Sequence, residues 1–400
     1  MAARARSRPE RGRHASPRRR PACHVNQERP AMTTKMRVTF LLADPGNLAG
    51  GNRVLAQHAA YLRDAGHAVT LVATPRAARR TPGLRGRAKR LLGLEPAAGA
   101  TGSGRSVGDG HFGYAGLPLL RLSPGARPRP EDLPDADILV ASWWETAETA
   151  ADMPPGKGVP VHFIQDYETF GHLPRDRVQA VYDAPLFKIV VAGWLRAKMA
   201  EAHGAAAHVC ANGVDTATFD APPRARQPVP TVGFLHSVAP RKTVKLALDA
   251  LEIARTRIPG LQVRAFGAHK LQAPLPDWVD YVHRPAQADI PGLYAACDLW
   301  LFPSRSEGFG LPILEAMACR TPVLATDAGA APDLIDGLNG QVLPYGPQAF
   351  VDGIEAFFAR PAQDWPRISA AARATAEAND RAAASARFET LLHEAVATRG

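Results

Sequence analysis

The chain is a succession of short, continuous apolar runs, and this pattern constrains its fold more than any other feature. The runs lie at residues 37–42, 68–73, 119–122, 137–141, 159–164, 188–192 and 208–210, and then at 231–236, 261–266, 280–282, 298–302, 323–326 and 341–343. Amphipathic stretches at 52–65 and 243–258 predict helices between them. Apolar runs that do not alternate with polar residues are typical of strands covered on both faces, so the sequence predicts parallel sheets in doubly wound α/β domains.

A polar, proline-rich stretch at residues 221–230 interrupts the series and suits a linker. We therefore predict a Rossmann-like domain at 36–221, a linker at 222–230 and a second Rossmann-like domain at 231–375. Residues 376–400 are expected to form a C-terminal helix that packs back on the first domain. No fixed-period repeat is visible, which excludes solenoids and propellers.

Most of the positive charge lies before the first predicted strand. Residues 1–35 carry ten basic side chains against Glu10 and Glu28, which is +8 of the net +10. This segment has too few apolar residues to fold and is expected to be a disordered basic tail, or to precede a true start at Met32 or Met36. The alternative is a tail that contacts anionic lipid or nucleic acid. Because the remaining chain is nearly neutral, we expect no nucleic-acid partner.

Two further features bear on where the protein acts. The four cysteines show no paired spacing, and no apolar run approaches the roughly 18 residues of a membrane span, which favours a cytoplasmic protein. An Arg-rich insert at residues 75–110 repeats Leu84, Ala88, Leu91 and Leu92 at helical spacing. This helix is either a solvated loop element or a peripheral contact with the anionic inner face of a membrane.

The most informative stretch is residues 298–323. A buried strand at 299–302 stops at Pro303, a glycine-containing loop follows, and Pro312 suits the first turn of a helix. In an open parallel sheet, ligands bind outside the carboxyl ends of strands, where this loop lies. Unpaired amides at a helix N-terminus favour an anion such as a diphosphate. The residues expected to supply them are Gly308, Phe309, Gly310 and Leu311.

Two acids border the same loop. Glu307 precedes the predicted helix and Glu315 is expected in its first turn. Carboxylates repel phosphate but accept hydrogen bonds from sugar hydroxyls, so amides and acids together suit a nucleotide sugar. The alternative is structural, with Glu307 capping the helix and Glu315 an ordinary acid of its first turn.

The segment from Glu307 to Ala318 resembles the E-x7-E motif of the retaining glycosyltransferases of family 4, which have the GT-B fold of two Rossmann-like domains facing a central cleft. Gly50 and Gly51 are similar to that family's glycine loop near the donor phosphates, and the segments 212–215 and 339–340 also resemble family segments. The resemblance implies that Glu307 contacts the transferred sugar and Glu315 the donor ribose. It also implies retention of configuration and a hexosyltransferase that needs neither a metal nor another cofactor.

A narrower resemblance concerns the donor. The segments at residues 142–147, 163–168 and 192–195 are similar to segments of bacterial rhamnosyltransferases that use dTDP-rhamnose. This likeness implies dTDP-rhamnose as a donor.

The family places an Arg five residues before a Lys at the start of the second domain, both facing the diphosphate. Lys242 takes the Lys position, but Ser237 stands where the Arg would be, so Arg241 is the candidate for the second cation. The family's Gly before Thr-Pro-Val is here Arg320, which puts the local helix end in question.

Acceptor-binding candidates follow two strand ends of the first domain. Asp166 and Glu168 could orient acceptor hydroxyls or act as a general base, although Asp166 could equally cap the next helix. Trp143 could stack on a sugar or close the core. Asp135 and Asp137 match a metal-binding DxD, but they begin a strand rather than end one, so we predict no metal site.

The sequence thus predicts an enzyme that moves a sugar from a nucleotide diphosphate to a glycan, lipid-linked or small-molecule acceptor, as in polysaccharide biosynthesis. The alternative enzymatic function is that of a nucleotide-sugar epimerase or of a phosphorylase with the same fold. A non-catalytic protein that binds sugar nucleotides or nucleic acid is the rival outside them.

Overall fold

The computed structural model describes residues 34–46, 49–74, 110–123, 125–268, 270–271 and 273–398. The predicted basic tail and the Arg-rich insert with its helix near residues 84–92 lie outside the described residues, apart from the few at their edges. In the part described, no helix combines the length and apolar character needed to cross a lipid bilayer.

The first domain is built on a parallel sheet that has seven strands among the described residues, in the order β3-β2-β1-β4-β5-β6-β7. Its strands are β1 (Arg37–Leu42), β2 (Ala68–Ala73), β3 (Leu119–Arg121), β4 (Ile138–Ala141), β5 (Val159–Ile164), β6 (Phe187–Val190) and β7 (His208–Val209). Its helices are α1 (Gly50–Asp64), α3 (Gly110–Tyr114), α4 (Trp144–Ala151), α5 (Arg175–Asp183) and α6 (Gly193–His203), with 3-10 turns at Pro130–Asp132 and Pro155–Lys157.

The second domain has a parallel sheet of six strands in the described chain, ordered β10-β9-β8-β11-β12-β13. These are β8 (Thr231–Leu235), β9 (Gln262–Gly267), β10 (Val279–His283), β11 (Leu299–Phe302), β12 (Val323–Thr326) and β13 (Gly340–Leu343). The helices are α7 (Val244–Arg257), α8 (Ile290–Ala295), α9 (Leu311–Ala318), α10 (Ala331–Leu334), α11 (Pro347–Ala359) and α12 (Trp365–Ala378), with 3-10 turns at Pro240–Lys242 and Ala362–Asp364. A last helix, α13 (Arg381–Ala397), follows them in the chain.

Both sheets confirm the predicted doubly wound α/β fold class. The strands β1, β4, β8 and β11 carry almost only buried residues, as strands covered on both faces must. In each sheet the strand order reverses beside the first strand, between β1 and β4 and between β8 and β11. A ligand crevice is expected at the carboxyl ends of the strands at such a reversal point.

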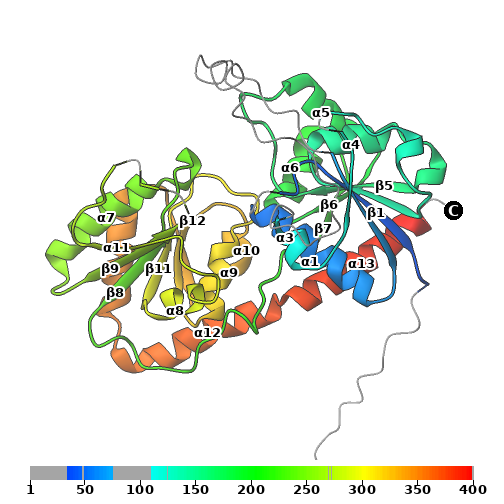
Figure 1. The fold of residues 1–400 in the computed structure, drawn as a ribbon. Helices are drawn as coiled ribbons and strands as arrows, with labels where there is room; N and C mark the ends of the chain where they lie inside the picture. The colour runs from blue at the N-terminus through cyan, green and yellow to red at the C-terminus, as the bar shows by residue number, and fades with distance from the viewer. Residues whose placement is uncertain are drawn as a thin grey trace, which may run out of the picture. The chain divides into compact units, whose positions relative to one another are not determined.

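The last helix, α13, packs against α1 and β5 of the first domain (Figure 1). Phe388 of α13 is fully buried, and its ring stacks on His58 of α1 with centroids 4.4 Å apart. His58 Nδ1 also lies 2.9 Å from the hydroxyl of Ser385. A chain that leaves the second domain after α12 therefore returns to complete the core of the first.

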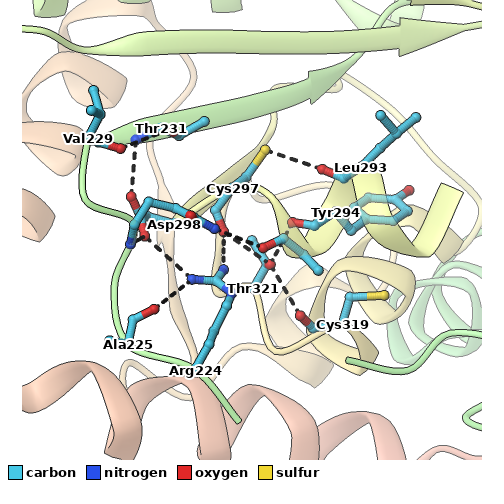
Figure 2. Close-up of polar contacts among 12 residues, drawn as sticks. Arg224, Ala225, Val229, Thr231, Leu293, Tyr294, Cys297, Asp298, Cys319 and Thr321 are labelled. Atoms are coloured by element: carbon cyan, nitrogen blue, oxygen red, sulfur yellow. Dashed lines mark hydrogen bonds and ion pairs between the residues drawn. The ribbon is translucent and has the colours of Figure 1, made fainter. Parts of the chain in front are cut away.

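The linker at residues 222–230 forms no helix or strand, and it is held on the second domain (Figure 2). Asp298 is fully buried at the start of β11, and its two carboxylate oxygens accept the main-chain N–H groups of Gln227, at 2.7 Å, and Thr231, at 3.0 Å. Arg224 donates to the main-chain oxygen of Cys297. The proline-rich stretch is thus anchored at several points by one buried acid and one arginine.

Arg320 ends the α9 segment in a left-handed conformation, with φ of 63°. This is the position where the resembled family has Gly, which adopts such angles without strain. The Arg320 Nε donates to the main-chain oxygen of Ala221 at 2.9 Å. Arg320 therefore takes the left-handed conformation that Gly adopts without strain, and its side chain adds a contact to the residue just before the linker.

Candidate functional site

The predicted donor-binding residues line one cleft, which has a volume of about 600 Å³. It lies beyond the carboxyl ends of β8 and β11 in the second domain and of β1 and β5 in the first. Its lining comprises Ala49, Gly50, Gly51, Arg53, His111, Tyr114, Gln165, Asp166, Asn212, Leu235, Arg241, Lys242, Gln287, Glu307, Gly308, Phe309, Gly310, Leu311, Pro312 and Glu315.

The turn before α9 offers unused hydrogen-bond donors to this cleft. Gly310 is the residue before the helix and has φ of 98°, a left-handed angle that favours glycine. In the described chain, the main-chain N–H groups of residues 308–311 donate to no protein acceptor. The carbonyl groups are used, since Gly308 accepts the Trp194 indole N–H at 2.9 Å and Phe309 accepts from Ala330 at 2.8 Å. The turn is fixed through its carbonyls while its amides stay available for an anion.

Glu307 is buried beside this turn, with 5% of its surface exposed. Its Oε1 accepts the Ser304 hydroxyl at 2.7 Å and forms an ion pair with the ammonium group of Lys242. Lys242 ends the 3-10 turn that follows β8, whereas Glu307 follows β11, the neighbouring strand. The reversal of strand order in the second sheet therefore brings a cation and an acid together at one point.

Glu315 lies in the second turn of α9, so its expected place in the first turn is wrong by one turn, because the helix begins only at Leu311. Its two oxygens have different partners: Oε1 pairs with the Arg53 guanidinium at 2.5 Å, and Oε2 accepts the Tyr294 hydroxyl at 2.9 Å. Burial and the charge of Glu315 raise the pKa of Tyr294 well above its ordinary value, which keeps this hydroxyl a donor.

Arg53 belongs to α1 of the first domain, three residues after Gly50. Burial acts to lower the pKa of Arg53, but the charge of Glu315 and the hydrogen bond to it outweigh burial, so the pKa is raised. The first turn of α1, which begins at Gly50 and Gly51, and the acid of α9 are therefore connected directly by one ion pair.

Asp166 and Arg241 form a third ion pair, with Oδ2 2.5 Å from a guanidinium nitrogen. Asp166 follows β5, and Arg241 precedes Lys242 in the turn after β8. Burial is the main cause that raises the pKa of Asp166; Arg241 opposes it, and the nearby charge of Glu307 adds to it. Across the cleft, three cations thus face three carboxylates.

Two of the acceptor-binding candidates lie elsewhere. Glu168 is buried and accepts the main-chain N–H of Trp144 at 2.9 Å, so it satisfies a donor in the first turn of α4 rather than lining the cleft. Trp143 is half-buried and lines a separate cavity of about 670 Å³, which also contains Arg127 and Arg177. Both side chains follow their strand as predicted, but they turn toward α4 instead of the glycine turn.

Several cleft residues were not singled out by the sequence. Gln165 precedes Asp166, and the amide oxygens of Gln165 and Asn212 are buried without a hydrogen-bond partner among the described residues. Asn212 was noticed only as part of a segment, and Gln165 only as a neighbour of Asp166. The available signal for Arg53 was its place beside Gly50 and Gly51, whereas nothing in the sequence marks Tyr294 as the partner of Glu315.

The two acids of the DxD-like segment hold positive side chains. Asp135 pairs with Lys157 at 2.9 Å, and Asp137 pairs with Arg37 at 2.8 Å. These ion pairs lower the pKa of both carboxyl groups. Both acids stand at the amino end of β4, on the side of the sheet opposite to the strand ends that border the cleft.

One group of side chains in the described chain has ligand atoms close enough to share a metal: His67, Glu389 and His393. The hydrogen bonds of His67 leave neither ring nitrogen available to a metal. The N–H of Met36 donates to His67 Nδ1 at 3.0 Å, so Nε2 carries the ring proton and donates it to Glu389 at 2.8 Å. A metal at Nε2 would have to displace that proton and leave a charged ring. The cluster serves to fasten α13 to the first domain.

Comparison with known proteins places these features in a family context. Residues 229–360 match the family described as "Glycosyl transferases group 1". The O-antigen chain mannosyltransferase B of Escherichia coli is 38% identical over 103 residues, 25% of this chain and 26% of the relative. The GDP-mannose-dependent alpha-(1-6)-phosphatidylinositol monomannoside mannosyltransferase of Mycobacterium tuberculosis is 30% identical over 172 residues, 36% of this chain and 45% of the relative. The chain thus spans less than half the length of these two relatives.

Solved structures share the whole fold at low sequence identity. Sucrose-phosphate synthase from Thermosynechococcus elongatus superposes with a TM-score of 0.66 at 18% identity, covering 91% of this chain and 100% of that one. Anabaena Alr3699/HepE in complex with UDP gives 0.68 at 19% identity, covering 90% and 100%. These likenesses confirm the GT-B architecture.

Proposed function

We propose that this chain, whose residues 229–360 form a group 1 glycosyltransferase domain, transfers a hexosyl group from a nucleotide-diphosphate sugar to a hydroxyl acceptor. One observation carries the proposal. Among the residues that the structure describes, the amides of residues 308–311 have no protein acceptor, and they line a cleft that also holds Lys242, Glu307 and Glu315. Main-chain donors with a nearby cation suit a diphosphate. Buried carboxylates suit the hydroxyl groups of the ribose and of the transferred sugar, which the diphosphate joins.

In this proposal the residues have separate roles. The amides and Lys242 hold the diphosphate and stabilise the charge that develops on it when the glycosidic bond breaks. Glu307 contacts the transferred sugar and supports the positive character of its anomeric carbon. Glu315, held by Arg53 and Tyr294, presents its remaining lone pairs to the ribose hydroxyls. No step calls for a metal ion or another cofactor, and we propose retention of configuration.

The donor is proposed from two sources that differ. The similar proteins named above are mannosyltransferases, and one is named for GDP-mannose. This favours a hexose donor with a guanine base. The likeness of residues 142–147, 163–168 and 192–195 to dTDP-rhamnose enzymes is the alternative, and it stays a prediction. The acceptor is proposed to be a glycan or a lipid-linked glycan, since those relatives act in O-antigen and phosphatidylinositol mannoside synthesis by their names.

A donor screen followed by product analysis tests the proposal. Thermal stabilisation by GDP, UDP and dTDP identifies the base, because a ligand that binds the folded state raises its apparent stability. Incubation with the matching nucleotide sugars and extracted glycolipid is then analysed by mass spectrometry. Release of nucleoside diphosphate together with a glycosylated acceptor supports the proposal. Conversion of the donor without an acceptor supports an epimerase, a requirement for inorganic phosphate supports a phosphorylase, and binding without turnover supports a non-catalytic protein.

A further inference from the structure

The carboxylate of Asp166 forms an ion pair with Arg241, which is one of the cations that a bound diphosphate would need. Its Oδ2 lies 2.5 Å from Arg241, while its Oδ1 accepts its neighbour Tyr167's main-chain N–H at 2.9 Å. Both carboxylate oxygens are thereby engaged, and the acid is fixed in place. The Asp166 side chain is 19% exposed and that of Arg241 41%, so the pair is partly shielded from water.

Arg241 is the cation with the most freedom to change partners. Lys242 is held against Glu307, and Arg53 against Glu315, in contacts whose acid side chains are 6% and 9% exposed. Arg241 is more exposed than either of the other two cations and lies in a short turn before α7. A diphosphate on the amides of residues 308–311 would add negative charge beside Asp166, and two anions cannot share one guanidinium without mutual repulsion.

We infer that Asp166 holds Arg241 in the absence of donor and releases it to the donor's diphosphate, so that Asp166 is free to position an acceptor hydroxyl only after the donor has bound. The inference rests on the proposed function, which it extends to the order of the two substrates. Asp166 is here a positioning residue for Arg241 that competes with the donor.

Two features support this exchange. The pKa of Asp166 is already raised, mainly by burial and also by the charge of Glu307; Arg241 opposes the rise most, and the hydrogen bond from the Tyr167 N–H opposes it less. Loss of Arg241 to a diphosphate removes that opposition, which makes the freed carboxylate a better hydrogen-bond acceptor and a stronger base. In addition, the main chain of this loop is held independently of Arg241, since Glu168 N–H donates to the Tyr182 hydroxyl at 2.8 Å.

The test compares Asp166→Asn with the native chain by calorimetric titration with GDP, UDP and dTDP. Asparagine keeps an acceptor for the Tyr167 N–H but loses the charge that holds Arg241. Affinity for the diphosphate that binds the native chain is expected to increase by roughly 3- to 10-fold. The reason is that Arg241 no longer has to break an ion pair with residue 166 before it can bind the diphosphate. In a transfer assay the donor KM is expected to fall together with kcat.

Two further variants make the result specific. Asp333→Asn is the matched control, because Asp333 also contacts the first domain, through Gly193 N–H at 3.0 Å, but does not line the cleft. Its affinity is expected to stay within about twofold of native. In an Arg241→Gln background, Asp166→Asn should bring no gain, since the competing partner is absent.

The outcomes separate the two proposals. Unchanged or weaker diphosphate binding by Asp166→Asn overturns the inference, as does an equal gain in the Arg241→Gln background. Failure of the native chain to bind any of the three diphosphates instead overturns the proposed function, and the inference with it.

Discussion

A Cβ atom placed on Gly308 would stand 1.8 Å from the main-chain oxygen of Gln165, far inside any real contact. Gly308 belongs to the second domain and Gln165 to the first, so the absence of one side chain permits the turn before α9 to approach the loop after β5. The same turn carries the free amides, and the approach therefore contributes to the shape of the proposed diphosphate site.

Gly308→Ala should disturb this approach. Because the obstructing atom is a backbone oxygen rather than a flexible side chain, the loop or the turn must move, and we expect a loss of about 1–3 kcal/mol in the free energy of unfolding with a marked loss of diphosphate affinity. Urea denaturation and calorimetry measure the two effects. Gly292→Ala is the control, since its Cβ meets nothing within 4 Å in α8, and it should be stabilising by about 0.5–1 kcal/mol. A Gly308→Ala protein with native stability and affinity would refute the argument.

Glu307→Gln should abolish most transfer while leaving the fold intact. The amide keeps an acceptor for the Ser304 hydroxyl, but the charge facing Lys242 and the anomeric carbon is lost. We expect kcat/KM to decrease by at least about 100-fold, the scale seen when one group that stabilises the transition state is removed. Initial rates over a range of donor concentrations, at a fixed concentration of acceptor, measure kcat/KM for the donor. Glu355→Gln, which removes a half-exposed partner of Arg257, should retain native rates. Near-native turnover by Glu307→Gln would exclude the proposed role.

Tyr294→Phe should lower stability by about 2 kcal/mol, because it removes a buried hydrogen bond to a charged group. Urea denaturation at pH 7 measures the change. Tyr345→Phe is the matched control: Tyr345 is 47% exposed, and its hydroxyl accepts a hydrogen bond from the exposed Arg305, so we expect a change within about 0.5 kcal/mol. Equal effects of the two substitutions would show that Tyr294 does not support Glu315.

Asp298→Ala should be strongly destabilising. It leaves the N–H groups of Gln227 and Thr231 without their acceptor and Arg224 without its ion pair, so we expect a loss of about 3 kcal/mol or more (Figure 2). Thermal or urea unfolding measures it. Asp280→Ala, which removes an exposed acid 3.6 Å from Arg264, should change stability by less than about 1 kcal/mol. If both variants are equally stable, the linker is not anchored as described.

Stability should fall as the pH is lowered from 6 to 5. Burial lowers the pKa of His58 and of His162 to about 3, from 6.5 in the unfolded chain. The contribution of the two neutral histidines to the free energy of unfolding is therefore complete above pH 6.5. It is lost as the pH falls, because the unfolded state binds protons at these histidines and the folded state does not. Each histidine contributes up to about 1.4 kcal/mol per pH unit.

Urea denaturation at pH 7, 6 and 5 measures that slope. His162→Gln should make it shallower by about one histidine's share. The exposed His283, replaced in the same way, should leave it unchanged. A slope that is the same in all three proteins would mean that His162 titrates normally in the folded state.

The sheets were predictable because their strands are buried on both faces and therefore consist of apolar runs. The runs at residues 37–42 and 323–326 became β1 and β12 with the predicted limits. Glu307 and Gly308 could also be placed, since a strand end, a glycine loop and a helix start lie within a dozen residues. Each of these patterns involves residues that are close together in the chain, so it can be read from a single sequence.

The partners of the site residues were not predictable in this way. Arg53 meets Glu315 across 262 residues, and Arg241 meets Asp166 across 75, so neither pair leaves a trace in local spacing. Glu168 and Trp143 are residues that the sequence suggested for acceptor binding but that do not line the cleft. Both follow a strand end, but the direction of a side chain after a strand depends on the helix that packs there, here α4.

Diphosphate binding by the turn before α9 and Lys242 can be measured by calorimetric titration of the native chain and of Lys242→Gln with GDP, UDP and dTDP. We predict that one of them binds the native chain with one site per chain, and that Lys242→Gln weakens this affinity by about 10- to 100-fold through loss of a charged hydrogen bond. Binding of none of the three, or equal affinity of the two proteins, would contradict it.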